Sequence, residues 1–166
     1  MHGVPERDGA QRQVKFALIA FAAVANLVLA DAVVKELSVG FLKAKTAIAV
    51  IPGFFNLAYV ENRGCAWGMF QGQVWPLAIF AVAALGFLVW KRKSVFGEGA
   101  WARVAEILLY AGIIGNLIDR VCRGYVIDMF DFYIKTSHFP CFNLADAYIS
   151  VAAGIMILCS FGKRTC

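Results

Sequence analysis

Long apolar runs separated by short polar stretches dominate the chain. A helix needs roughly 17 to 25 residues to cross the hydrocarbon core of a bilayer, and four apolar stretches approach that length. They cover about residues 14–34, 74–90, 104–119 and 142–161, and polar residues gather where they end. The pattern predicts a mainly α-helical, polytopic membrane protein with four transmembrane helices in one membrane-embedded domain over residues 1–166.

The two longer connecting segments, at about residues 39–73 and 120–141, do not resemble plain linkers. Residues 48–51 and 57–60 are rich in β-prone side chains and flank the turn pair Pro52-Gly53. Aromatic residues suited to a membrane interface surround them. We expect a small β-rich cradle, a sheet or hairpin, against the outer leaflet.

Composition and charge support the same class. Hydrophobic residues make up 61% of the chain, well above the share in soluble domains. The formal net charge is +5, but the Lys and Arg residues form short clusters between apolar runs and no basic stripe for nucleic acid. By the positive-inside rule both termini are predicted to be cytoplasmic. The clusters that mark this side are Arg7, Arg12, Lys15, Lys91, Arg92, Lys93, Arg103, Lys163 and Arg164.

The five cysteines form no C-x-x-C pair and no metal-ligand spacing, so we interpret most of them as small apolar residues. Cys122 and Cys141 are expected on the same side of the membrane, which leaves a disulfide between them open. A zinc site lacks ligands. The sequence therefore indicates no metal and no cofactor.

Polar side chains at membrane depth cost about 2.5 to 3.5 kcal/mol each, so their positions carry information. In the predicted topology, residues from three spans and one loop meet near the outer membrane face, which predicts a single polar site. For individual pairs, helix capping or an interhelical hydrogen bond remains an alternative. The residues are Asp31, Asn116, Asp119, Arg120, Asp128, Asp131, Asn143 and Asp146.

Asp128 lies in a run of β-branched and aromatic residues at 124–133, where a carboxyl group is partly desolvated. If Asp128 and Asp146 come within about 4 Å, their charges repel by about 4 kcal/mol at an effective dielectric near 20, and one proton is then shared at neutral pH. That state suits peptide hydrolysis. The chain has only two histidines, His2 and His138, and no nucleophile motif, which disfavours a Ser/His or Cys/His enzyme.

Five blocks of sequence, in order over about residues 16–160, carry a family resemblance. The chain resembles the bacterial lipoprotein signal peptidases, also called signal peptidase II, which are membrane aspartyl endopeptidases. The blocks are Asp31-Ala-Val-Val-Lys35, Asn62-Arg-Gly64 with Trp67 and Phe70 after it, Gly115-Asn116-Leu-Ile-Asp119-Arg120, Gly124-Tyr-Val-Ile-Asp128, and Phe142-Asn143-Leu-Ala145-Asp146.

The resemblance implies cleavage of prolipoproteins just before a diacylglyceryl-modified cysteine, with Asp128 and Asp146 as the catalytic pair. It implies a monomer in the bacterial inner membrane, with lipidated prolipoproteins and membrane lipid as partners. We expect Asp119 to pair with a basic neighbour. The residues implied to line or support the pocket are Asp31, Lys35, Asn62, Gly64, Asn116, Arg120 and Asn143.

Two other functions compete with the peptidase. The intramembrane acids could belong to a small ion or proton transporter, or the chain could be a noncatalytic membrane scaffold. A Mg²⁺ or Ca²⁺ site made by Asp119, Asp128 and Asp131 is also conceivable, because carboxylates suit these ions.

Overall fold

The computed structural model describes residues 5–45 and 47–161, with side chains from residue 11 on except that of Arg12. His2, Lys163, Arg164, Cys166 and the side chains of Arg7 and Arg12 lie outside this description. The elements in chain order are α1 (Pro5–Leu42), β1 (Ile48–Ile51), β2 (Phe55–Asn62), the 3-10 turn η1 (Ala66–Gly68), α2 (Val74–Trp90), α3 (Arg92–Phe96), α4 (Ala100–Arg123), β3 (Val126–Ile134), β4 (Ser137–His138) and α5 (Leu144–Phe161).

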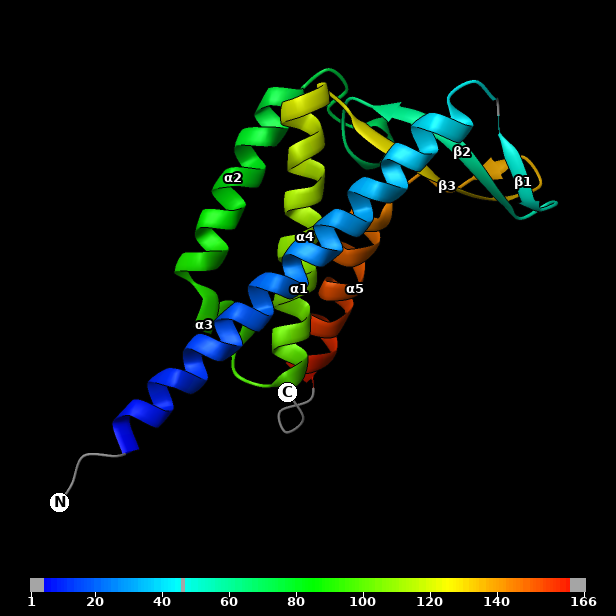
Figure 1. Cartoon of the computed structure of the whole chain (residues 1–166). Coiled ribbons are helices and arrows are strands. Elements are labelled where there is room, and N and C mark those ends of the chain that lie inside the picture. The colour runs from blue at the N-terminus through cyan, green and yellow to red at the C-terminus, as the bar shows by residue number, and fades with distance from the viewer. Residues whose placement is uncertain (1–4, 46, 162–166) are drawn as a thin grey trace.

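The helices form an apolar bundle with the sheet at one end (Figure 1). Within the described residues, α1, α4 and α5 are long and apolar enough to cross a membrane, and α2 is a shorter apolar helix. The boundaries of α2 agree with the expected span 74–90. The other three differ: α1 and α4 extend beyond 14–34 and 104–119, and α5 begins two residues after 142. The small helix α3 was not predicted.

Helix α1 continues past Lys35 because this lysine is buried in the protein and not solvated. One turn later Ser38 donates a hydrogen bond to the carbonyl of Val34, and Leu42 then packs with Ile127 and Met129 of β3. The last turns of α1 therefore support the sheet.

Helix α4 contacts α1, α2 and α5, and its glycines allow this close packing. A Cβ atom at Gly112 would lie 2.4 Å from the carbonyl oxygen of Ala145, and one at Gly115 would lie 2.8 Å from Oδ2 of Asp31. Both distances are shorter than a carbon atom tolerates. The start of α5 and the Asp31 carboxyl group can approach α4 only because these side chains are absent.

The sheet is antiparallel, with strand order β1-β2-β3-β4. The predicted hairpin is confirmed, because β1 and β2 pair around Pro52 and Gly53. Strand β3 pairs along β2, with Val60 opposite Asp128 and Asn56 opposite Asp131. The segment that carries Asp128 is thus anchored in the sheet.

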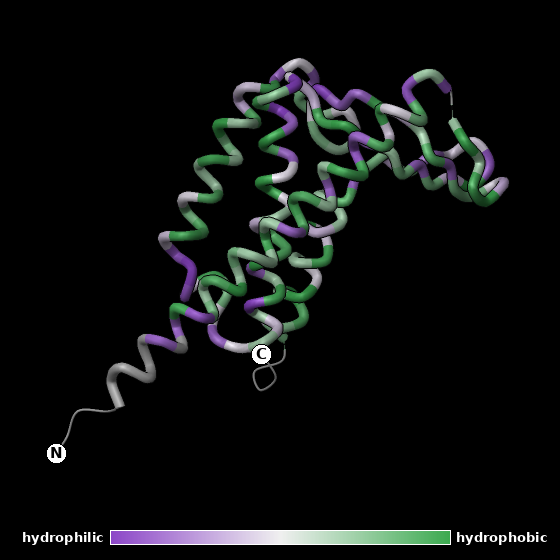
Figure 2. Tube along the Cα trace, viewed as in Figure 1, coloured by the Kyte–Doolittle hydropathy of each residue, from purple (hydrophilic) through white to green (hydrophobic). Residues whose placement is uncertain are grey.

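The outer surfaces of the helices are apolar. Hydrophobic positions follow the middle of the bundle, and polar positions gather at its two ends (Figure 2). Side chains such as Phe21, Phe80 and Leu158 are more than two-thirds exposed, as expected for a multi-pass membrane protein whose helices face lipid. The possible disulfide is not formed, since Cys122 and Cys141 are free thiols.

Candidate active site

Asp128 and Asp146 come from different elements and meet at Asn143. The Nδ2 of Asn143 donates a hydrogen bond of 2.7 Å to Oδ1 of Asp128, and the Asn143 backbone N–H donates one of 3.3 Å to Oδ2 of Asp146. In return, the backbone N–H of Asp146 donates to Oδ1 of Asn143 at 3.0 Å. This reciprocal pattern is a capping box at the start of α5. The capping alternative and the shared site are therefore both correct for Asn143 and Asp146.

Two further side-chain amides donate hydrogen bonds to Asp128 and Asp146. Asn62 donates to Oδ2 of Asp128 at 2.9 Å, and Asn116 donates to Oδ1 of Asp146 at 2.7 Å. Each of the four carboxyl oxygens thus accepts a hydrogen bond from a neutral N–H group. Among the described residues, no Lys or Arg forms an ion pair with Asp128 or Asp146.

This environment favours a proton on the pair. Asp128 is 1% exposed, and burial followed by the negative charge of Asp146 raises the pKa of Asp128 to about 7. The hydrogen bonds from Asn62 and Asn143 act in the opposite direction but are outweighed. At neutral pH Asp128 is therefore near the midpoint of its titration, which is the property that a general acid or base needs.

A second buried cluster lies beside the pair. The Nζ of Lys35 contacts Oδ2 of Asp31 at 2.7 Å and Oδ2 of Asp119 at 2.9 Å, and it donates to Oδ1 of Asn116 at 3.2 Å. Lys35 is 1% exposed. The same Asn116 oxygen accepts a hydrogen bond from Asn143. The Asn116 and Asn143 side chains therefore connect the Lys35 cluster to Asp128 and Asp146.

Asp31 and Asp119 also hold the backbones that carry the pair. Oδ1 of Asp31 accepts a hydrogen bond of 3.0 Å from the backbone N–H of Ala145, the residue before Asp146. Oδ2 of Asp119 accepts one of 3.2 Å from the backbone N–H of Ile127, the residue before Asp128. Asp119 pairs with Lys35 and Arg123, as expected for a basic neighbour.

The loop after β2 closes over this region. Asn62 accepts a hydrogen bond from the Gly64 backbone N–H at 2.9 Å, and Arg120 donates to the Gly64 carbonyl at 3.2 Å. A Cβ at Gly64 would lie 2.4 Å from the carbonyl oxygen of Met69, so only glycine fits the turn. Asn62, Gly64 and Arg120 thus fix the loop next to Asp128.

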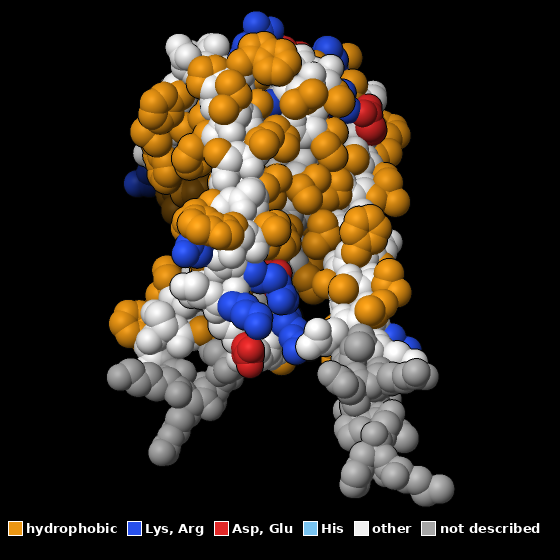
Figure 3. Space-filling view, turned by 90° about the vertical axis from the view of Figure 1, so that its left-hand side faces the viewer, with side chains coloured by type: hydrophobic (Ala, Val, Ile, Leu, Met, Phe, Trp, Pro, Cys, Tyr) orange, Lys and Arg blue, Asp and Glu red, His pale blue; other side chains and the backbone are white. Residues whose placement is uncertain are grey.

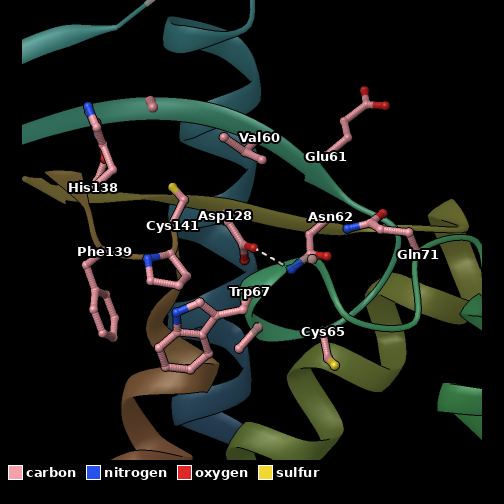
Figure 4. Close-up of a pocket in the computed structure, with 15 residues that line it drawn as sticks. Val60, Glu61, Asn62, Cys65, Trp67, Gln71, Asp128, His138, Phe139 and Cys141 are labelled. Atoms are coloured by element: carbon pink, nitrogen blue, oxygen red, sulfur yellow. Dashed lines mark hydrogen bonds and ion pairs between the residues drawn. The ribbon is translucent and has the colours of Figure 1, made fainter. Parts of the chain in front are cut away.

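A pocket of about 500 Å³ lies beside Asp128, between this loop and the β3–β4 segment (Figure 4). Trp67 and Phe139 stack edge to face at its rim, with ring centroids 5.8 Å apart. Cys141 also lines the pocket, but burial raises the pKa of its thiol to about 12, so it is a poor nucleophile.

Comparison with known proteins identifies the family of the chain. The model of the family described as "Signal peptidase (SPase) II" matches residues 22–162. The chain belongs to the signal peptidase II family. It is therefore an aspartic-type peptidase, and the comparisons do not favour the transporter or scaffold alternatives.

Relatives and solved structures cover most of this signal peptidase II. It is 41% identical to a lipoprotein signal peptidase of Shewanella loihica, over 80% of each chain. It is 38% identical to that of Syntrophotalea carbinolica, over 81% of this chain and 86% of the other. A bacterial membrane enzyme structure determined by the in meso method shares 31% identity and a TM-score of 0.76, over 86% of this chain and 87% of the other.

The structure brings the predicted site residues into one hydrogen-bonded network around Asp128 and Asp146, except Asp131, which bonds to Asn56 and His138. The alternative metal site is not formed. No group of three possible metal-binding side chains occurs in the described part of the chain, and Asp119 and Asp131 bond to different partners. Sequence reasoning missed the placement of His138, which pairs with Asp131 and lines the pocket. Its position opposite Tyr133 across the β3–β4 hairpin was the available signal.

Proposed function

We propose that Asp128 and Asp146 are the catalytic pair of a signal peptidase that cleaves prolipoproteins just before a diacylglyceryl-modified cysteine. The observation that carries the assignment is that Asn143 donates a hydrogen bond to each of the two carboxyl groups. Burial and the Asp146 charge also raise the pKa of Asp128 to about 7. The names of the relatives, lipoprotein signal peptidases, support the substrate class.

The chemistry follows from one proton held by two carboxyl groups. The ionised carboxylate takes a proton from a water molecule, whose oxygen attacks the scissile carbonyl carbon. The protonated partner donates a hydrogen bond to the carbonyl oxygen and stabilises the negative charge that develops there. A proton then passes to the leaving nitrogen as the C–N bond breaks. The two acids titrate as a pair, so the proton belongs to both.

The neighbouring residues keep this pair aligned. Asn62, Asn116 and Asn143 fix the carboxyl oxygens, and the Lys35 cluster fixes the strand and helix that carry them. Gly64 belongs to the loop that closes the pocket, and Arg120 of α4 holds this loop through its hydrogen bond to the Gly64 carbonyl. These are positioning roles, because the side chains act through Asp128 and Asp146.

The fold supports a membrane placement for this reaction. The start of α1 and the end of α5 lie at the end of the bundle opposite the sheet (Figure 1). Lys and Arg side chains gather near that same end (Figure 3). The connection between α2 and α4 lies there in Figure 1, and it carries Lys91, Arg92 and Lys93. By the positive-inside rule we place this end in the cytoplasm, and the acids near the outer face of the inner membrane. The enzyme acts as a monomer, and the substrate acyl chains lie between its helices in lipid.

The test is cleavage of a lipidated precursor by purified protein in detergent. Asp128→Asn and Asp146→Asn keep the shape of each side chain but remove the acid, and each should lower kcat by at least about a thousandfold. Glu98→Gln is the matched control, because this exposed carboxylate lies in the connection between α3 and α4. Substantial turnover by either aspartate variant, with the control unchanged, would disprove the catalytic pair.

A further inference from the structure

A β-bulge turns Asp131 toward the same pocket as Asp128. The backbone N–H groups of Met129 and Phe130 both donate to the carbonyl oxygen of Phe142, at 3.0 and 2.9 Å. Two residues of β3 thus oppose one residue of the partner segment, which breaks the alternation of side chains along the strand. In a regular strand, residues three apart point to opposite faces. Here Asp128 and Asp131 both line the pocket.

Asp131 is held in place together with His138. Its Oδ1 lies 2.7 Å from Nδ1 of His138, and its Oδ2 accepts a hydrogen bond of 2.9 Å from Asn56. The imidazole stacks on Tyr133 with ring centroids 5.0 Å apart and planes inclined by 11°. The His138 side chain is 52% exposed, whereas that of Asp131 is 14% exposed. The pair is therefore rigid, and its histidine is accessible.

The Asp131–His138 pair forms one wall of the pocket, and this wall favours positive charge. In Figure 4, His138 lies on one side of Asp128 and Asn62 on the other. Asp131, which pairs with His138, also lines the pocket. No Lys or Arg is among the described residues that line the pocket. The charge of Asp131 is therefore balanced by no fixed cation within the pocket. Among side chains entering from outside, the wall attracts cations and repels anions.

We propose that the Asp131–His138 pair determines specificity by contacting the residues that follow the lipid-modified cysteine, and that it disfavours an acidic side chain there. This inference rests on the proposed peptidase function. The apolar signal segment of the substrate stays in lipid, while the mature segment must leave toward water. The described residues that line the pocket come from β2, the loop after it, β3, β4 and the segment before α5, and none comes from the apolar helices α1, α2, α4 and α5. The pocket therefore lies on the path of the mature segment.

The test compares two lipidated precursors that differ only in the residue directly after the modified cysteine, Lys or Glu. The wild type should cleave the Lys substrate with a kcat/KM about tenfold higher than the Glu substrate. Asp131→Asn should reduce this ratio to about threefold or less. His138→Lys places a fixed cation beside Asp131 and should bring the ratio to about one or below.

Two controls make the outcome decisive. Glu98→Gln removes the same charge at the far end of the bundle and should leave the ratio unchanged. A third substrate with Gln at the variable position measures activity independently of charge, so a misfolded variant is recognised by loss of all three activities. A wild-type ratio near one, or a ratio unaffected in both Asp131→Asn and His138→Lys, would overturn the proposal. Cleavage by Asp128→Asn would instead refute the catalytic pair and is a separate result.

Discussion

Two groups of aspartates lie side by side in this molecule, and they differ in their charged partners. Asp31 and Asp119 each contact the ammonium group of Lys35, and Asp119 also pairs with Arg123. The oxygens of Asp128 and Asp146 accept hydrogen bonds from amides instead. Contact with a cation stabilises the charged form of a buried carboxylate more than neutral hydrogen-bond donors do.

Because of this difference, the two groups of aspartates have different roles within one network. The compensated acids hold the backbone N–H groups of Ala145 and Ile127 and so fix where the second pair lies. The uncompensated acids can exchange a proton at neutral pH. Asp31, Asp119 and Asp128 are all buried, so burial alone does not distinguish the two groups, whereas contact with Lys35 does.

The largest effect is expected when the Lys35 cation is removed. Lys35→Met leaves Asp31 and Asp119 buried without compensation, and the free energy of unfolding should fall by about 3 to 5 kcal/mol. Thermal unfolding in detergent measures the loss. Lys43→Met is the control, because Lys43 is half exposed and lies 3.7 Å from Glu61, so its loss should cost less than about 0.5 kcal/mol.

A rescue sharpens the same prediction. Adding Asp31→Asn and Asp119→Asn to Lys35→Met gives a neutral cluster and should recover a large part of the lost stability. A Lys35→Met protein as stable as the wild type would mean that the two acids do not depend on the lysine.

Asn143 lies where the two groups of aspartates meet. Its substitution is expected to have a smaller effect on stability and a large effect on activity. In Asn143→Ser the serine still caps α5, since serine and asparagine are equally good caps, but Asp128 loses a hydrogen bond from a buried amide. We expect kcat to fall about a hundredfold, while the free energy of unfolding changes by about 1 kcal/mol.

The pH profile of Asn143→Ser separates this role from a merely structural one. The Asn143 hydrogen bond lowers the pKa of Asp128, so its loss should raise that pKa further. The decline of activity at high pH should therefore move to a higher pH than in the wild type. A profile that keeps its shape and position while kcat falls would contradict the proposed contact with the reacting proton.

The sequence predicts much of this architecture because the membrane imposes a simple pattern. The uninterrupted apolar run of α2 has no polar residue to obscure its ends, and its boundaries agree with the expected span. Helix α1 ends later than predicted, because Lys35 ends the apolar run but not the helix. The structure compensates this lysine inside the protein, and hydropathy cannot distinguish such a buried lysine from one at a helix end.

Part of the site could be predicted from the sequence in the same way. Asp128 and Asp146 stand out in the sequence because each acid interrupts an apolar segment. The role of Asp131 cannot be recognised in this way. Its direction depends on the bulge at Met129 and Phe130, which requires a carbonyl group from a distant segment and leaves no trace in the alternation of residues. Long-range backbone pairing of this kind cannot be derived from periodicity alone.

Infrared titration of the carboxyl groups tests the central claim most directly. The pKa of Asp128 is raised, so its proton is retained as the pH increases from the ordinary aspartate range and is lost as the pH passes through about 7. A protonated-carboxyl band should therefore disappear near pH 7 in the wild type and be missing from that range in Asp128→Asn. If no carboxyl group of the wild type titrates above about pH 5, the shared proton does not exist and the account is contradicted.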